Sequence, residues 1–121
     1  MTQVLIIEDD ETLRVAYEFV IKKSGYTVAT ARNGHEGLEL LGRLSPKVVL
    51  LDMLMPIKNG MDFLKEAKVS SRYPDTTVIL LSNLSESALN EQAIKLGARE
   101  AVLKAAIIPS ELIKIVAKYV N

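Results

Sequence analysis

Polar side chains that could take part in chemistry follow directly after short apolar runs of this chain. They are a group of three carboxylates, a single carboxylate, a hydroxyl and an amine, namely Glu8-Asp9-Asp10, Asp52, Ser82 and Lys104. Uninterrupted apolar runs of about four residues are typical of strands buried on both faces, as in a parallel sheet covered by helices. Ligand sites in such sheets lie beyond the carboxyl ends of the strands. We therefore expect these polar residues to share one pocket.

Several carboxylates in one pocket favour the binding of a divalent cation. Like charges held close together raise each other's pKa, whereas a hard cation keeps carboxylates ionised and bridges them. A small set of oxygen ligands beside a nucleophile favours magnesium over calcium or zinc. Such a pocket suits a carboxylate nucleophile that accepts a phosphoryl group, because this transfer depends on positioning and on neutralising the phosphoryl oxygens.

Between the apolar runs, the sequence has the period of amphipathic helices. Apolar residues recur three and four positions apart, and glycine or proline stands near the ends of several of these segments. Strands are expected at residues 4–7, 27–31, 48–52, 78–82 and 102–103, and helices at residues 13–21, 34–43, 60–67, 89–96 and 109–120. This alternation predicts an α/β fold, a flavodoxin-like (βα)5 three-layer sandwich whose parallel sheet has the strand order 2-1-3-4-5.

The strand order determines which polar residues meet. In the order 2-1-3-4-5, the first and third strands are neighbours at the point where the winding of the chain reverses. Glu8, Asp9 and Asp52 should therefore converge there, while the fourth and fifth strands bring Ser82 and Lys104 from one side.

The composition limits the classes of protein to which the chain can belong. Its 121 residues, 49% of them hydrophobic, suffice for one core, so we expect a single domain over residues 1–121. Fifteen basic and fifteen acidic residues cancel, which makes nucleic acid and anionic membranes poor candidates for direct partners. No cysteine is present, which excludes disulfides and thiolate metal sites. Because no apolar stretch approaches the roughly 18 residues of a membrane span, we expect a cytoplasmic protein.

Taken together, these motifs resemble the receiver domain of two-component response regulators. The resemblance is carried by residues 4–14, by residues 51–60 with their Asp52-Met53-Leu54-Met55-Pro56 sequence, and by Ser82, Leu96-Gly97-Ala98 and Lys104. It extends in order and spacing over essentially the whole chain. It implies a phosphoacceptor of a two-component or phosphorelay system, which at most assists its own phosphorylation and dephosphorylation and is not otherwise an enzyme.

The resemblance also implies a role for each acidic residue. Asp52 would be the phosphoacceptor, and Mg²⁺ would be held by the carboxylates of Glu8, Asp9 and Asp52 and by the backbone carbonyl of Leu54. Asp10 falls just past the acidic pair, at a variable position of the family, and is left out of the metal shell. Considered alone, however, three acidic residues after a strand are as typical of a helix N-terminus, whose amides they cap, as of a metal site.

Further implied roles concern switching and partners. Ser82 would bond the phosphoryl group when the domain switches, and Lys104 would pair with Asp52 or its phosphate. The phosphoryl donor would be a phosphohistidine on a sensor histidine kinase or a histidine phosphotransfer protein. A downstream protein would bind the face formed by the fourth helix, the fifth strand and the fifth helix.

The sequence departs from the family pattern near its last strand, and other residues have simpler interpretations. Receivers usually carry proline after the lysine and an aromatic residue three positions before it, where this chain has Ala105 and Ala101. A cis bond before a non-proline residue costs about 3–4 kcal/mol, so we expect a trans bond before Ala105. Tyr17 and Phe19 are interpreted as packing residues, and His35 as a surface residue.

One enzyme class is an alternative to the receiver. An aspartyl-phosphate phosphohydrolase on a related sheet would also use an aspartate nucleophile. Such hydrolases typically carry a second aspartate two residues later as general acid, where this chain has Leu54. The receiver is therefore the preferred interpretation.

Overall fold

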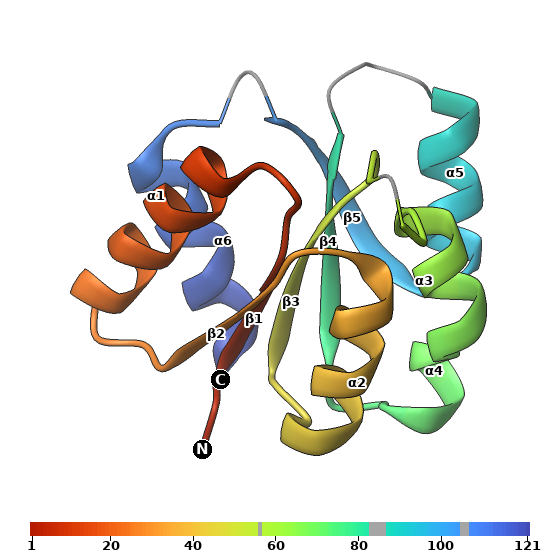
Figure 1. Cartoon of the computed structure of the whole chain (residues 1–121), viewed down its shortest axis with the longest axis horizontal. Helices are drawn as coiled ribbons and strands as arrows, with labels where there is room; N and C mark the ends of the chain where they lie inside the picture. Colours follow the sequence, from red (N-terminus) through yellow and green to blue (C-terminus); the bar gives the residue numbers. More distant parts are fainter. Residues whose placement is uncertain (56, 83–86, 105–106) are drawn as a thin grey trace.

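The strands form the sheet that the sequence predicts. The computed structural model describes residues 1–55, 57–82, 87–104 and 107–121. Its five strands form one parallel sheet in the order β2-β1-β3-β4-β5, in which β1 and β3 are neighbours (Figure 1). The strands are β1 (Val4–Ile7), β2 (Val28–Ala31), β3 (Val48–Asp52), β4 (Thr77–Ser82) and β5 (Ala98–Leu103).

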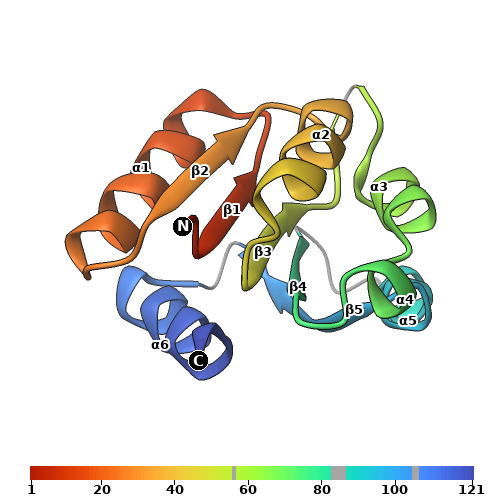
Figure 2. The same ribbon diagram turned by 90° about the horizontal axis from the view of Figure 1, so that it is seen from below.

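Helices cover both faces of this sheet and complete the flavodoxin-like sandwich. One face carries α1 (Glu11–Lys23) and α6 (Pro109–Val120), and the other carries α2 (Gly34–Leu44), α3 (Gly60–Ala67) and α5 (Ser87–Lys95) (Figures 1 and 2). Every residue of β1 and β3 is buried, because these central strands are covered on both sides. No helix in the described part of the chain is long and apolar enough to cross a membrane.

Two elements differ from the prediction. The last strand begins at Ala98, four residues earlier than expected, and a short helix, α4 (Val69–Arg72), follows α3. The strand was predicted too short because β5 lies at the edge of the sheet, where Arg99 is exposed and interrupts the apolar run. The α4 segment is too short to show a helical period, and it is anchored by the buried Val69.

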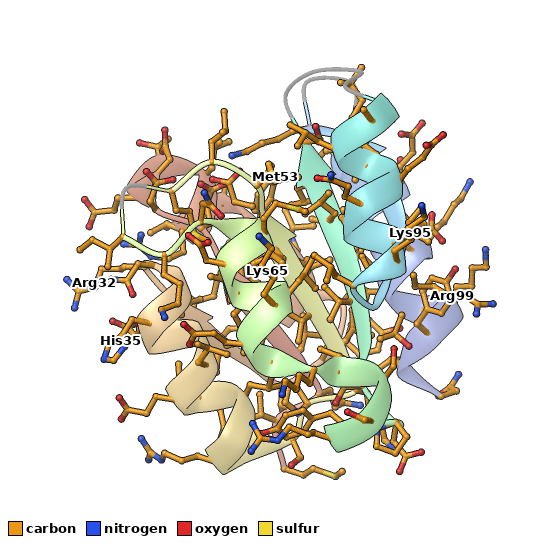
Figure 3. All side chains as sticks on the ribbon, turned by 90° about the vertical axis from the view of Figure 1, so that its right-hand side faces the viewer. Arg32, His35, Met53, Lys65, Lys95 and Arg99 are labelled. Atoms are coloured by element: carbon orange, nitrogen blue, oxygen red, sulfur yellow. The ribbon has the colours of Figure 1, made fainter. Side chains whose placement is uncertain are left out.

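The surface residues confirm one interpretation and contradict another. His35 is exposed, as expected, and in Figure 3 it points away from the body of the molecule together with Arg32. Tyr17 is buried in the core, but the interpretation of Phe19 as a packing residue is wrong, because its side chain is 63% exposed. The Lys23 ammonium lies 5.7 Å from the centre of the Phe19 ring, so the ring is covered by a charge rather than by the core. The bond before Ala105 lies outside the described residues.

Polar residues fix where helices begin at the carboxyl edge of the sheet. The side chains of Asp10, Asn33 and Asn59 each accept a hydrogen bond from the backbone amide three residues later, at the starts of α1, α2 and α3. These caps satisfy amides that have no partner within the helix. They also fix the loops that lead from the strands into the helices, and those loops carry the acidic residues.

The start of α2 packs directly against the loop between β3 and α3. The amide of Gly34 donates to the carbonyls of Ile57, at 3.2 Å, and Lys58, at 3.1 Å. A Cβ atom at Gly34 would lie 2.2 Å from the carbonyl oxygen of Lys58. Glycine is therefore required at this position by the close approach of two backbones.

We predict opposite effects for two glycine-to-alanine substitutions in α2. Gly34→Ala should lower the free energy of unfolding by about 2 kcal/mol, because the loop has to move away from the new methyl group. Gly42→Ala should leave it unchanged or raise it by up to about 1 kcal/mol, because alanine favours helix and the nearest atom to its Cβ, the Tyr73 hydroxyl, is 3.6 Å away. Urea unfolding of both variants measures the difference. Equal effects would contradict the role given to Gly34.

Candidate functional site

The acidic residues converge at the carboxyl edge of the sheet, at the top of Figure 1, as the sequence predicts. In the parallel register of β1 and β3, Ile7 is paired with Leu51, so the next residues, Glu8 and Asp52, lie side by side at the carboxyl edge of the sheet. One carboxylate oxygen from each of Glu8, Asp9 and Asp52 lies within 4.8 Å of the others. Glu8 and Asp52 are buried, whereas Asp9 is exposed.

A lysine that directly follows the fifth strand completes this group. The Lys104 ammonium lies 2.5 Å from Oε1 of Glu8 and 3.3 Å from Oδ1 of Asp52. Its side chain is only 9% exposed, so both ion pairs are largely shielded from water. Ser82 is buried at the end of β4, one residue beyond the partner of Asp52 in the register of β3 and β4. All the side chains assigned to the site from the sequence are thus at one edge.

Burial determines the charge state of this group. It raises the pKa of Asp52 to about 7, and the hydrogen bond and negative charge of Glu8 act in the same direction, while Lys104 opposes them. Burial alone would lower the pKa of Lys104, but Glu8 and Asp52 outweigh it and the net shift is upward. The lysine therefore stays charged, and one further positive charge or proton is needed to compensate both carboxylates.

Arg14, for which the sequence analysis predicts no role, stabilises the loop after β1. The Nη1 group of Arg14 donates to the backbone carbonyls of Glu8, at 3.0 Å, and Asp9, at 3.4 Å. The backbone amide of Asp10 donates to Oε2 of Glu8 at 3.1 Å, which orients that carboxylate. Arg14 could not be found from a local pattern, because its contact depends on how the loop turns back over the first turn of α1.

Asp10 is the N-cap residue of α1. Its Oδ1 accepts a hydrogen bond from the amide of Leu13 at 3.0 Å. The acidic run is thus divided between two arrangements: Asp10 caps α1, while Glu8 and Asp9 each bring a carboxylate oxygen close to Asp52.

These groups border an open pocket of about 420 Å³. It is lined by Glu8, Asp9, Asp10, Leu13, Tyr17, Asp52, Leu54 and Lys104. Leu54 is 60% exposed on its rim, whereas Met53, which comes between Asp52 and Leu54, is buried on the inner side of the loop (Figure 3). Tyr17, interpreted from the sequence as a packing residue only, also contributes to the wall.

The donor set fits a hard divalent cation. Among the described residues, Glu8, Asp9 and Asp52 are the acidic residues whose oxygens come close enough together to hold a metal ion, and they offer oxygen atoms alone. Oxygen donors without histidine or cysteine suit Mg²⁺ rather than Zn²⁺. A cation would also supply the positive charge that Lys104 by itself cannot provide.

Comparison with known proteins places this sequence among the receiver domains. A family model for the response regulator receiver domain matches residues 4–117. The chemotaxis protein CheY of Thermotoga maritima is 36% identical over 103 residues, which are 84% of each chain. The transcriptional regulatory protein LnrK of Bacillus subtilis is 33% identical over 106 residues, which are 86% of this chain but only 47% of that protein.

Solved structures agree with the fold over nearly the whole chain. The chemotaxis protein CheY4 of Vibrio cholerae has a TM-score of 0.88 at 25% identity and 98% coverage of both chains. A response regulator receiver domain protein from Clostridium thermocellum has a TM-score of 0.86 at 30% identity, and the match covers 100% of this chain and 95% of that one. Since the family match runs from β1 into α6 and includes every strand that contributes to the acidic edge, this chain belongs to the response regulator receiver domain family.

Proposed function

We propose that Asp52 is the phosphoacceptor of this receiver domain, and that it takes a phosphoryl group from a phosphohistidine on a sensor histidine kinase or a histidine phosphotransfer protein. The observation that carries this proposal is the convergence of Asp52 with Glu8, Asp9 and Lys104 at one edge of the sheet. The site opens to solvent through a broad pocket, so a protein-bound imidazole can approach it.

The transfer exchanges one phosphorus bond for another. A carboxylate oxygen of Asp52 forms a bond to phosphorus, the bond between phosphorus and the imidazole nitrogen breaks, and the nitrogen leaves with its electron pair and takes up a proton. Mg²⁺, held by Glu8, Asp9, Asp52 and the backbone carbonyl of Leu54, would supply positive charge for the phosphoryl oxygens. Lys104, directly after β5, supplies a second positive charge beside Asp52. Asp52 is buried deeply enough for these charges to act with little screening.

Phosphorylation would change the surface through which a partner binds. Ser82 stands at the end of β4, where its hydroxyl can bond a phosphoryl oxygen, and the face formed by α5, β5 and α6 lies beyond it. Ile94 on α5 and Leu103 on β5 are exposed apolar residues of this face. We infer that this face binds the downstream protein, and that the domain works in the cytoplasm with its kinase.

No described residue supports a phosphohydrolase. The position of the general acid in such enzymes is occupied by Leu54, whose exposed side chain cannot transfer a proton. The receiver function therefore remains the proposal.

We predict that Asp52→Asn abolishes phosphorylation. The parent protein, incubated with Mg²⁺ and a small phosphodonor, should gain the mass of one phosphoryl group, and acid should release it. The variant should gain none, because an amide is no nucleophile for phosphorus. Asp75→Asn, an exposed aspartate before β4, is the matched control and should gain phosphate like the parent. Equal phosphorylation of Asp52→Asn would show that the acceptor is another residue.

We predict that Asp9→Ala weakens Mg²⁺ binding by more than about tenfold. Mutation of residues that only hydrogen-bond to a metal ligand already lowers metal affinity by about tenfold or more, and Asp9 would be a direct ligand. The fold should persist, because Asp9 is exposed. Calorimetric titration with Mg²⁺ measures the affinity. Asp10→Asn is the control, since asparagine also caps helices and should leave the titration unchanged. If the control loses affinity and Asp9→Ala does not, the ligand role belongs to Asp10.

We predict that the stabilisation by Mg²⁺ grows with pH. The pKa of Asp52 is about 7 in the folded, metal-free protein, against about 4 in an unfolded chain. Between these values the folded state binds more protons, so its stability falls as the pH rises towards 7. Mg²⁺ replaces the proton and offsets this loss. The rise in melting temperature caused by Mg²⁺ should therefore be larger at about pH 8 than at about pH 5, and Asp52→Asn should remove most of the difference. A rise independent of pH would contradict the prediction.

A further inference from the structure

Tyr17 belongs to the core and to the acidic pocket at once. It lies on α1 with a side chain that is only 9% exposed, packed in the cluster that contains Ile6, Leu81 and Leu112. The same side chain lines the pocket beside Asp52 and Lys104. An apolar residue would fill this place in the core equally well, so packing alone gives no reason for a hydroxyl group.

The hydroxyl of Tyr17 has no hydrogen bond to any residue that the structure describes; its surroundings act on it through burial and through charges. Burial raises the pKa of Tyr17, Lys104 opposes this, and Glu8 and Asp52 add to it. The phenol therefore keeps its proton at neutral pH and can donate it in a hydrogen bond. Tyr17 borders an open pocket, and an acceptor that enters this pocket can replace water as the partner of its hydroxyl.

The pocket has few donors to offer such an acceptor. Its walls carry four carboxylate side chains, and the ammonium of Lys104 is already paired with Glu8 and Asp52. A phosphoryl group on Asp52 brings oxygens that accept strong hydrogen bonds. The proton of Tyr17 is available for one of them.

The tyrosine ring also has space to adjust. A second pocket of about 230 Å³ lies between α1 and the start of α6, and it shares Leu13, Tyr17 and Lys104 with the acidic pocket. Its remaining lining is apolar, from Ala16 and Val20 on one side and residues 107–109 on the other. This space beside the ring leaves room for its position to change when a group binds in the acidic pocket.

We propose that the hydroxyl of Tyr17 donates a hydrogen bond to the phosphoryl group on Asp52 and is a phosphoryl-binding residue of this domain. This inference rests on the proposed function, because it requires Asp52 to be the acceptor. Tyr17 would act only in the phosphorylated state. It would not contribute to Mg²⁺ binding, because a hydrogen-bond donor does not coordinate a cation.

Tyr17→Phe tests the proposal, because it removes the hydroxyl and leaves the ring. The probe is beryllium fluoride with Mg²⁺, a mimic of the phosphoryl group. The variant should bind this probe about tenfold more weakly, which corresponds to the loss of one hydrogen bond to a charged group. It should also be phosphorylated more slowly by a small phosphodonor at saturation. Its Mg²⁺ affinity and melting temperature should match those of the parent.

Two further variants separate the hydroxyl from the ring. Tyr26→Phe, which changes another tyrosine that packs on the same core cluster but does not line the pocket, should behave like the parent. Tyr17→Leu should lose affinity for the probe to the same extent as Tyr17→Phe. If Tyr17→Phe binds the probe like the parent, the inference is wrong, whatever Tyr17→Leu does. A parent protein that neither binds the probe nor gains phosphate would overturn the proposed function and, with it, this inference.

Discussion

The site depends on a single buried ammonium group that faces two buried carboxylates. Lys104 pairs with Glu8 and Asp52 at the ends of three strands, where water is largely excluded. Removing charges from water is costly unless partners compensate it, and one lysine can compensate only one carboxylate. The imbalance is visible in the upward shift of the pKa of Asp52, whose first cause is burial. An imbalance of this kind favours the uptake of a proton or a cation by the pocket.

The sheet and its loops keep these like charges together. Hydrogen bonds between β1 and β3 hold Glu8 and Asp52 at the same level of the sheet, and neither can move apart without breaking the central register. The backbone of the acidic loop is fixed by Arg14, whose guanidinium binds two of its carbonyls. Asp10 fixes the start of α1 behind the loop. The rigid scaffold thus offsets the repulsion, and the packing of α1 places Tyr17 at the wall of the same pocket.

Much of this arrangement could be predicted because it follows from local patterns. The apolar runs predict four of the five strands to within about one residue at each end. The polar residues at the ends of these runs predict the position of the pocket. The fifth strand was predicted too short, since Arg99 and its neighbours at the sheet edge do not form an apolar run. Phe19 was assigned to the core on residue type alone, but it faces solvent beside Lys23. A helical period shows which residues share a face, and it does not show whether another element covers that face.

The sequence by itself determined the fold class, the strand order and the set of groups that meet at the carboxyl edge, because periodicity, the handedness of crossovers and the parallel direction of the strands leave few alternatives. Only the tertiary structure decided how these groups interact. In the folded chain, Asp10 caps the helix and Glu8 pairs with Lys104. Arg14 donates a hydrogen bond to the acidic loop, and Tyr17 lines the pocket. These outcomes depend on side-chain direction and on the exclusion of water, which arise when distant segments pack and have no signature in the spacing of residues along the chain.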